Sequence, residues 1–405
     1  MPAWSHGAGL PVHITISNAF LRPAFDQSQS LRCSTDRQYS YVLCRRSIRT
    51  LQWQSRTFHS PIRRSFVTDS LPSILVPPVV FTGLLIGLWT YKCAMTVIFQ
   101  DKIIYMPYMP PFARSEKMED YAASCKPVEW EQRHIESIDG TRIAICIGMI
   151  APIETRRPVG AAKRKHVVVC YFQGNGSSPP PRLPLLSNVL KSVHAQTVGL
   201  TADVQYIIVA LSYRGYWTSS GRASQAGIEL DAKALLQWVT SEYSADDIDL
   251  QIILWGQSIG AGVASTAAAT YICNSKTLDG APINGLVLET PFTGIKSMLL
   301  ALYPQRWLPY QYLWPFLWNF WDSEAALRRI AESARKPKVL LLPATKDEVV
   351  PPSEVDKLEC ICHDVGLITQ RKNVMGALHT EATTRREGQE AVAKFMIEVA
   401  EADRS

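Results

Sequence analysis

The chain has 405 residues, of which 47% are hydrophobic, and this is enough for one large domain with accessory segments. Its formal net charge of +6 lies wholly in residues 1–70, which contain nine arginines, three aspartates and neither lysine nor glutamate. The remainder is neutral, so the basic net charge is no indication of nucleic-acid binding, and the main domain is expected to have an ordinary solvated surface. Nine cysteines without framework spacing exclude a disulfide scaffold. Cys360, Cys362 and His363 lack the second ligand pair that a zinc site needs, so no metal is expected there.

Residues 1–70 are rich in arginine and serine, poor in acidic residues and without a sustained apolar period. This composition is typical of an organellar transit peptide, and an unstructured cytosolic tail in front of an anchor is the alternative. Eighteen uncharged residues follow at 74–91, near the minimum length for a transmembrane helix. We predict a membrane anchor over residues 71–95; the alternative is a buried core helix or a hydrophobic support under the domain.

The arginines predict the orientation of this anchor. Six of them lie between Arg45 and Arg64, ahead of the span, whereas the residues just after it are mixed in sign. The amino terminus is therefore expected in the cytosol and the main domain across the bilayer. The sequence predicts a single-pass protein of the endoplasmic reticulum or another endomembrane. A transit peptide would instead deliver it to a mitochondrial membrane.

A juxtamembrane connector is predicted over residues 96–128. Prolines and tyrosines recur between Phe99 and Arg114, so this stretch is expected to be extended, neither helical nor flexible. Two strands should follow as an antiparallel pair around the Asp139-Gly140 turn. A polar surface loop is predicted at residues 151–165.

Beyond that hairpin, apolar runs typical of strands buried on both faces alternate with helical patterns. The predicted strands are 166–172, 204–213, 252–255, 283–290 and the run that starts at 337, and the predicted helices are 224–240, 258–273 and 381–400. This alternation predicts an α/β domain over residues 129–400, with a mostly parallel sheet and helices on both faces.

The segment Gly256-Gln257-Ser258-Ile259-Gly260 lies between an apolar strand and a helix of small residues. This G-x-S-x-G pattern in this context is typical of a nucleophile elbow, in which the serine hydroxyl stands above the edge of the sheet. The first N–H groups of the following helix would point toward an oxyanion formed there. The glycine-rich Gln173-Gly174-Asn175 stretch ends another strand and would bring further backbone N–H groups to the same edge.

A serine nucleophile needs a base that takes its proton and an acid that orients the base. Asp347 follows the apolar run "VLLLPATK" and is the predicted acid, with Glu348 as its neighbouring rival. His379 precedes the last predicted helix and is the predicted base. His363 lies within a predicted helix and is interpreted as a surface or packing residue.

The alternation breaks over residues 291–322. Nineteen residues from Tyr303 to Trp321 contain four tryptophans, three tyrosines and two phenylalanines. We predict a short aromatic cap over the site, with an apolar underside that could accept an acyl chain. The alternative is that these aromatic side chains pack against the core or rest on the membrane surface.

Six motifs in this order carry a family resemblance: "YFQGNGSS", "LSYRGYWTSSG", "GQSIGAG", "LETPFTGIKSML", "ATKDEVVPP" and "GALHT". The region from 99 to 400 resembles the α/β-hydrolase superfamily, most of all the single-pass, membrane-anchored serine hydrolases of fungi and animals. The resemblance implies a triad of Ser258, Asp347 and His379. It also implies an oxyanion hole formed by the N–H of Ile259 and by the Gly174-Asn175 turn. Where such proteins usually have histidine, this chain has Gln173.

The activity that this resemblance implies is acyl transfer to water through an acyl-enzyme, which requires neither a cofactor nor a metal. The expected substrates are acyl esters, lysophospholipids or acyl-thioesters, and the expected partner is the lipid bilayer, with no nucleic acid. An acyltransferase that uses the same acyl-enzyme is one alternative. A non-catalytic membrane scaffold that keeps the fold is the other.

Overall fold

The computed structural model describes residues 72–151, 163–197, 204–274, 281–306, 308 and 310–402. The predicted arginine- and serine-rich segment, 1–70, lies outside these residues, as does most of the predicted polar loop at 151–165.

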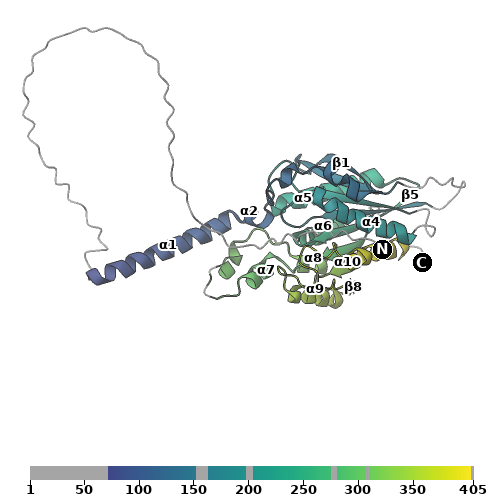
Figure 1. Cartoon of the computed structure of the whole chain (residues 1–405). Coiled ribbons are helices and arrows are strands. Elements are labelled where there is room, and N and C mark those ends of the chain that lie inside the picture. Colours follow the sequence, from purple (N-terminus) through teal and green to yellow (C-terminus); the bar gives the residue numbers. More distant parts are fainter. Residues whose placement is uncertain are drawn as a thin grey trace, which may run out of the picture. The chain divides into compact units, whose positions relative to one another are not determined.

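An eight-stranded sheet forms the centre of the described part of the chain, with β1 and β8 at its opposite edges (Figure 1). Its strands are β1 Glu129–Glu136, β2 Arg142–Met149, β3 Arg164–Phe172, β4 Val204–Ser212, β5 Ile248–Gln257, β6 Ile283–Glu289, β7 Lys338–Leu342 and β8 Thr369–Arg371. They lie in the order β1-β2-β4-β3-β5-β6-β7-β8. The β1–β2 and β2–β4 pairs are antiparallel and all other pairs are parallel. The predicted antiparallel opening and the mostly parallel sheet are therefore confirmed.

Helices cover both faces of this sheet. They are α1 Val76–Ile98, α2 Gln100–Tyr105, α3 Ala122–Cys125, α4 Leu183–Thr197, α5 Gln225–Tyr243, α6 Ile259–Asn274, α7 Ile295–Leu302, α8 Ser323–Ala331, α9 Pro352–Asp364 and α10 Arg386–Glu401. The side chains of α4 and α10 pack in one core cluster, and those of α5, α6, α8 and α9 in another. Helices cover both faces of these strands, so neither face is exposed to water. This explains why β3 to β7 are continuous apolar runs in the sequence.

Helix α1 has the properties of a membrane span. The helical stretch Ser73–Ile98 has a mean hydropathy of 1.8, and none of its most apolar window is buried against the rest of the chain. It is the one stretch among the described residues that is long and apolar enough to cross a bilayer. The alternative of a buried core helix is therefore wrong.

Two predictions about helices are wrong. The connector was expected to be non-helical, but α2 covers Gln100–Tyr105, where no proline interrupts the chain. The last helix was expected to begin at Glu381, but α10 begins at Arg386. The residues before it form turns, in which the main-chain N–H and the hydroxyl of Thr383 donate to the carboxylate of Glu289. A contact with a distant strand thus replaces the first helical turn.

A buried ion pair holds the loop after β4. Arg214 donates to Asp231 of α5 at 2.7 Å and to Asp139 of the β1–β2 turn at 2.8 Å. The Asp231 side chain is fully buried. The Arg214 guanidinium holds the pKa of the Asp139 carboxyl well below its usual range. The neighbouring Tyr213 donates its hydroxyl to the main-chain oxygen of Gln173 at 2.8 Å, so this ion pair supports the glycine-rich loop after β3.

We expect Arg214→Ala to lower the free energy of unfolding by about 3–5 kcal/mol, because it leaves the Asp231 carboxylate buried without a cation. Arg133 offers a matched control. It pairs with Glu131 and Glu242 on the surface, so Arg133→Ala should cost about 1 kcal/mol or less. Thermal unfolding of the full chain in detergent would compare the two. Equal losses would contradict this account of Arg214.

Candidate active site

Ser258 lies at a sharp corner between β5 and α6. Its φ is +54°, a left-handed conformation that is strained for a residue with a side chain. Two main-chain bonds hold this corner: the N–H of Ser258 donates to the oxygen of Glu289 at 2.8 Å, and the N–H of Ala261 donates to the oxygen of Ser258 at 2.8 Å. The side chain is half-buried at the carboxyl edge of the sheet, where a substrate can reach it.

The three residues predicted to act together are joined by hydrogen bonds. His379 Nε2 lies 2.8 Å from Ser258 Oγ, and His379 Nδ1 lies 2.8 Å from Asp347 Oδ2. When Nδ1–H donates to the carboxylate, the lone pair of Nε2 is free to accept the serine proton. The side chains of His379 and Asp347 are 8% and 6% exposed, so bulk water competes little for these bonds.

The geometry also shows which of the two adjacent acids, Asp347 or Glu348, pairs with the imidazole of His379. Asp347 Oδ1 accepts the main-chain N–H groups of Val349 and Val350 at 2.9 and 2.7 Å, which fixes the plane of the carboxylate. Glu348 instead accepts the main-chain N–H of His379 at 2.9 Å. The imidazole thus pairs with Asp347, and Glu348 holds the backbone that carries it.

Two glycines of the elbow allow the main chain to pack very closely. A Cβ on Gly260 would lie 2.1 Å from the main-chain oxygen of Phe172, and a Cβ on Gly256 would lie 2.0 Å from the oxygen of Gly260. Both distances are shorter than any real contact of a Cβ atom. The first turn of α6, which includes Ile259, is therefore pressed against the end of β3, beside the loop that holds Gly174.

Gly260→Ala should lower the free energy of unfolding by about 3 kcal/mol, because the new methyl group would have to displace the main-chain oxygens of Phe172 and Gln173. The same displacement should separate α6 from the loop after β3 and reduce ester hydrolysis. Gly294→Ala is a suitable control, since an added Cβ there would meet its nearest atom at 3.5 Å. Thermal unfolding and hydrolysis would be measured for both. Equal behaviour of the two variants would show that close packing at Gly260 is not required.

The loop after β3 is held from outside the sheet by the connector. The main-chain oxygen of Tyr105 accepts the N–H of Gly176 at 2.9 Å and also the hydroxyl of Tyr216. The Tyr105 hydroxyl donates to Asn319 Oδ1 at 2.7 Å. Burial raises the pKa of the Tyr105 phenol, so this hydroxyl keeps its proton as a donor. Asn175, one of the predicted oxyanion donors, directly precedes Gly176 and is exposed.

Glu289 was missed by sequence reasoning. It ends β6 and is 1% exposed, and its carboxylate accepts Trp255 Nε1 at 3.0 Å and Thr383 Oγ1 at 2.8 Å. Burial raises the pKa of this carboxyl, and the bond from Thr383 opposes the shift. Because its main-chain oxygen holds Ser258, Glu289 connects the serine corner to the loop that follows His379. The sequence feature that could have identified Glu289 is a single acidic residue at the end of an apolar strand.

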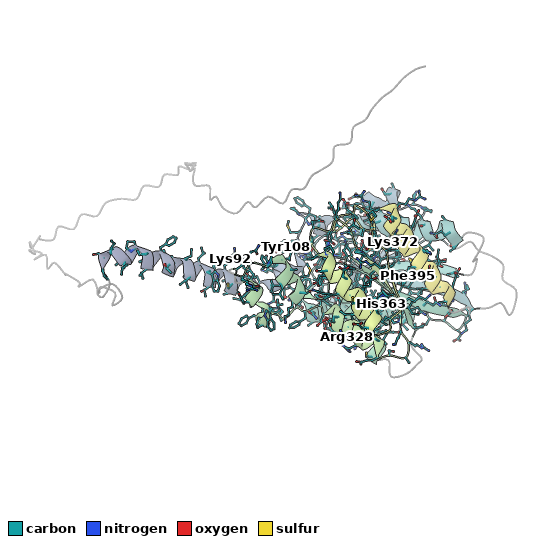
Figure 2. All side chains as sticks on the ribbon, turned by 90° about the horizontal axis from the view of Figure 1, so that it is seen from below. Lys92, Tyr108, Arg328, His363, Lys372 and Phe395 are labelled. Carbon is teal, nitrogen blue, oxygen red and sulfur yellow. The ribbon has the colours of Figure 1, made fainter. Side chains whose placement is uncertain are left out.

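The three residues Cys360, Cys362 and His363, for which no metal is expected, differ in burial. On α9, Cys362 is buried in the core and Cys360 is exposed. His363 is also exposed and is labelled in Figure 2. Among the described residues no three histidine, cysteine, aspartate or glutamate side chains are grouped so that they could hold a metal ion.

Comparison with known proteins gives several relatives, and no family model matches the chain. Over 192 residues, 47% of this chain, it is 29% identical to protein bem46 of Schizosaccharomyces pombe, of which the match covers 55%. It is 26% identical over 281 residues to the α/β hydrolase domain-containing protein WAV2 of Arabidopsis thaliana, covering 67% of this chain and 78% of WAV2. It is 32% identical over 192 residues to the lysophosphatidylserine lipase ABHD12 of Danio rerio, covering 46% of this chain and 44% of the lipase. The chain thus spans about half the length of bem46 and of ABHD12.

A solved structure supports the same fold. An α/β hydrolase from Vibrio vulnificus superposes with a TM-score of 0.50 at 18% sequence identity, covering 76% of this chain and 91% of that protein. The sheet order, the serine corner between β5 and α6 and these relatives agree with one another. The chain has the α/β-hydrolase fold.

Proposed function

We propose that the protein is a serine hydrolase that cleaves acyl esters or thioesters of lipid type, with Ser258 as nucleophile, His379 as base and Asp347 as the acid that orients the base. The observation that carries this proposal is the unbroken series of hydrogen bonds from Ser258 Oγ through the imidazole to Asp347, with 2.8 Å at each step. Such a series supplies what a hydroxyl nucleophile lacks at neutral pH, a base within reach of its proton.

In the first stage His379 Nε2 takes the proton of Ser258 as Oγ attacks the acyl carbonyl. The carbonyl oxygen becomes an oxyanion, and the N–H groups of Ile259 and of the Gly174-Asn175 turn are proposed to hold it. Such donors are often worth about 3 kcal/mol each. The imidazolium then gives its proton to the leaving oxygen or sulfur. In the second stage the same imidazole takes a proton from water, which attacks the acyl-enzyme. The bond between Ser258 Oγ and the acyl group breaks, the imidazolium returns a proton to Oγ, and the acid is released.

A lipid-type substrate is supported by two observations. One relative is named a lysophosphatidylserine lipase, and the chain has a helix, α1, that is long and apolar enough to cross a bilayer, where lipid substrates reside. We also propose that α1 anchors the protein as a single-pass endomembrane protein, with the endoplasmic reticulum as the favoured site. Resistance to extraction by alkaline carbonate, lost on deletion of residues 73–98, would test the anchor.

The test of the activity uses the purified full chain in detergent. It should hydrolyse short water-soluble p-nitrophenyl esters and lysophospholipids. A fluorophosphonate probe should label it at one serine, and mass spectrometry of the labelled peptide should identify Ser258. A folded protein that is neither labelled nor active on any ester would contradict the proposal. Products formed only in the presence of an added alcohol would instead assign it as an acyltransferase.

A further inference from the structure

Large apolar side chains are exposed mainly in two short segments outside the α1 region. Of the described residues beyond the stretch 73–98, eighteen large hydrophobic side chains are exposed, and thirteen of these lie in residues 99–112 and 300–320. Phe112 is 83% exposed, Phe316 is 60% exposed and Tyr312 is 59% exposed. We name these two segments together the aromatic platform. Contiguous exposed apolar surface of this kind marks a site that another apolar phase covers.

The two segments of the aromatic platform are joined by hydrogen bonds. Gln100, which is buried, donates from Nε2 to the main-chain oxygen of Phe316 at 3.1 Å and accepts the main-chain N–H of Trp318 at 3.0 Å. Trp318 Nε1 donates to Asp101 at 2.9 Å. Gln100 begins α2 directly after the end of α1, so the aromatic platform continues the surface of the helix that is apolar enough to span a bilayer.

Lysines accompany the aromatic rings on this surface. Lys296 Nζ lies 3.8 Å from the centroid of the Trp314 ring, Lys102 Nζ lies 5.0 Å from that of Phe99, and Lys92 Nζ lies 5.5 Å from that of Tyr310. In the described part of the chain these are all the lysine–aromatic stacks of this kind. Rings at the level of the head groups, with lysines that reach lipid phosphates, are typical of a membrane interface. Protein–protein interfaces are instead depleted in lysine.

The aromatic platform is also close to the candidate active site. Tyr105 ends α2, and its main-chain oxygen holds Gly176 of the loop that carries the proposed oxyanion donors. Its hydroxyl holds Asn319, next to Trp318 of the platform. Figure 2 shows Lys92 and Tyr108 at the end of the described unit where α1 joins it. A lipid that leaves the bilayer at this surface would therefore meet the site loop first.

We propose that the aromatic platform lies in the interfacial layer of the bilayer that α1 spans, and that the ester substrate is a lipid that enters the site from this layer. This inference rests on the proposed function and specifies the route by which the lipid substrate reaches the site. Water-soluble esters bypass the platform, so the platform should matter for lipids in a membrane and not for the chemistry at Ser258.

The first test does not depend on activity. The full chain is reconstituted in nanodiscs that contain a phosphatidylcholine with a photoreactive group near the head group, and the crosslinked peptides are identified by mass spectrometry. We expect crosslinks in residues 99–112 and 300–320 as well as at the ends of α1, and none on the peptide that contains Ile368, a residue 66% exposed outside the platform. Crosslinks confined to α1 would overturn the proposal.

The second test separates lipid access from chemistry. In phosphatidylcholine vesicles that contain lysophosphatidylserine, the double variant Phe112→Ser and Phe316→Ser should hydrolyse this lipid about tenfold more slowly, because two large apolar groups no longer enter the membrane. Its hydrolysis of a p-nitrophenyl ester and its fluorophosphonate labelling should match those of the unmodified chain. The control variant Ile138→Ser and Ile368→Ser removes exposed apolar groups elsewhere and should behave as the unmodified chain.

Each other outcome is distinguishable. Equal loss with both substrates, or loss with neither, would overturn the platform proposal. A dimer in detergent that the double variant abolishes would assign the surface to a second copy of the chain and overturn it as well. Failure of the unmodified chain to act on soluble esters would contradict the proposed function, whereas the crosslinking result would still decide whether the aromatic platform contacts lipid.

Discussion

Replacing Ser258 with alanine is expected to lower ester hydrolysis by roughly 10⁶-fold and to abolish fluorophosphonate labelling. The variant keeps the imidazole and its carboxylate partner but has no oxygen to form the acyl-enzyme. Because alanine tolerates the left-handed backbone at this position about as well as serine does, the variant should unfold close to the temperature of the unmodified chain. Initial rates and labelling would be measured on the same preparations.

A surface serine provides the control for this variant. Ser241 is exposed on α5, where its hydroxyl donates to the main-chain oxygen of Trp238. Ser241→Ala should change neither rate nor labelling, and its effect on stability should stay within about 0.5 kcal/mol. Hydrolysis that survives in a folded Ser258→Ala protein would assign the nucleophile to another residue.

Asp347→Asn is expected to lower hydrolysis by about 10⁴-fold with little change in structure. The N–H groups of Val349 and Val350 bind Oδ1 of the aspartate, so in the variant they should retain the amide oxygen at that position. The amide NH₂ would then replace Oδ2 and donate to Nδ1 of His379. The proton of the imidazole would move to Nε2, which faces Ser258 and would no longer be a base.

Glu348→Gln is the matched control for this substitution, because it changes the adjacent acid in the same way. Glu348 accepts a main-chain N–H of His379, and a glutamine oxygen can accept the same bond. We expect a loss of less than about tenfold, because one charge-assisted bond becomes a neutral one. The two rates would be compared over a range of pH. A larger loss for Glu348→Gln than for Asp347→Asn would exchange the roles of the two acids.

The strands, the elbow and the order of the three reactive residues could be predicted from local patterns. An apolar run such as 166–172 must be covered on both faces, and a glycine-flanked serine between such a run and a helix has few other conformations. These features depend on residues within about ten positions of one another, so a hydrophobic period or a motif spacing in the sequence is enough to predict them. The parallel sheet, the helices on both faces and the position of Ser258 follow from them.

Other features depend on contacts between residues that are far apart in the chain. Placement at the end of a strand favours Asp347 over Glu348, but which carboxylate faces the imidazole of His379 is decided by the folded loop. The role of Glu289 and the late start of α10 both arise from a bond between β6 and Thr383. Tyr105 holds the loop after β3 from a connector that local patterns describe as extended.

The aromatic segment illustrates the same division. Its composition alone was compatible with a cap, with core packing or with the membrane surface. Exposure of its side chains, and the bonds from Gln100 and Asp101 that join it to the end of α1, favour the membrane. Burial and hydrogen bonding are properties of a folded neighbourhood, and no short window of sequence contains both partners of such contacts.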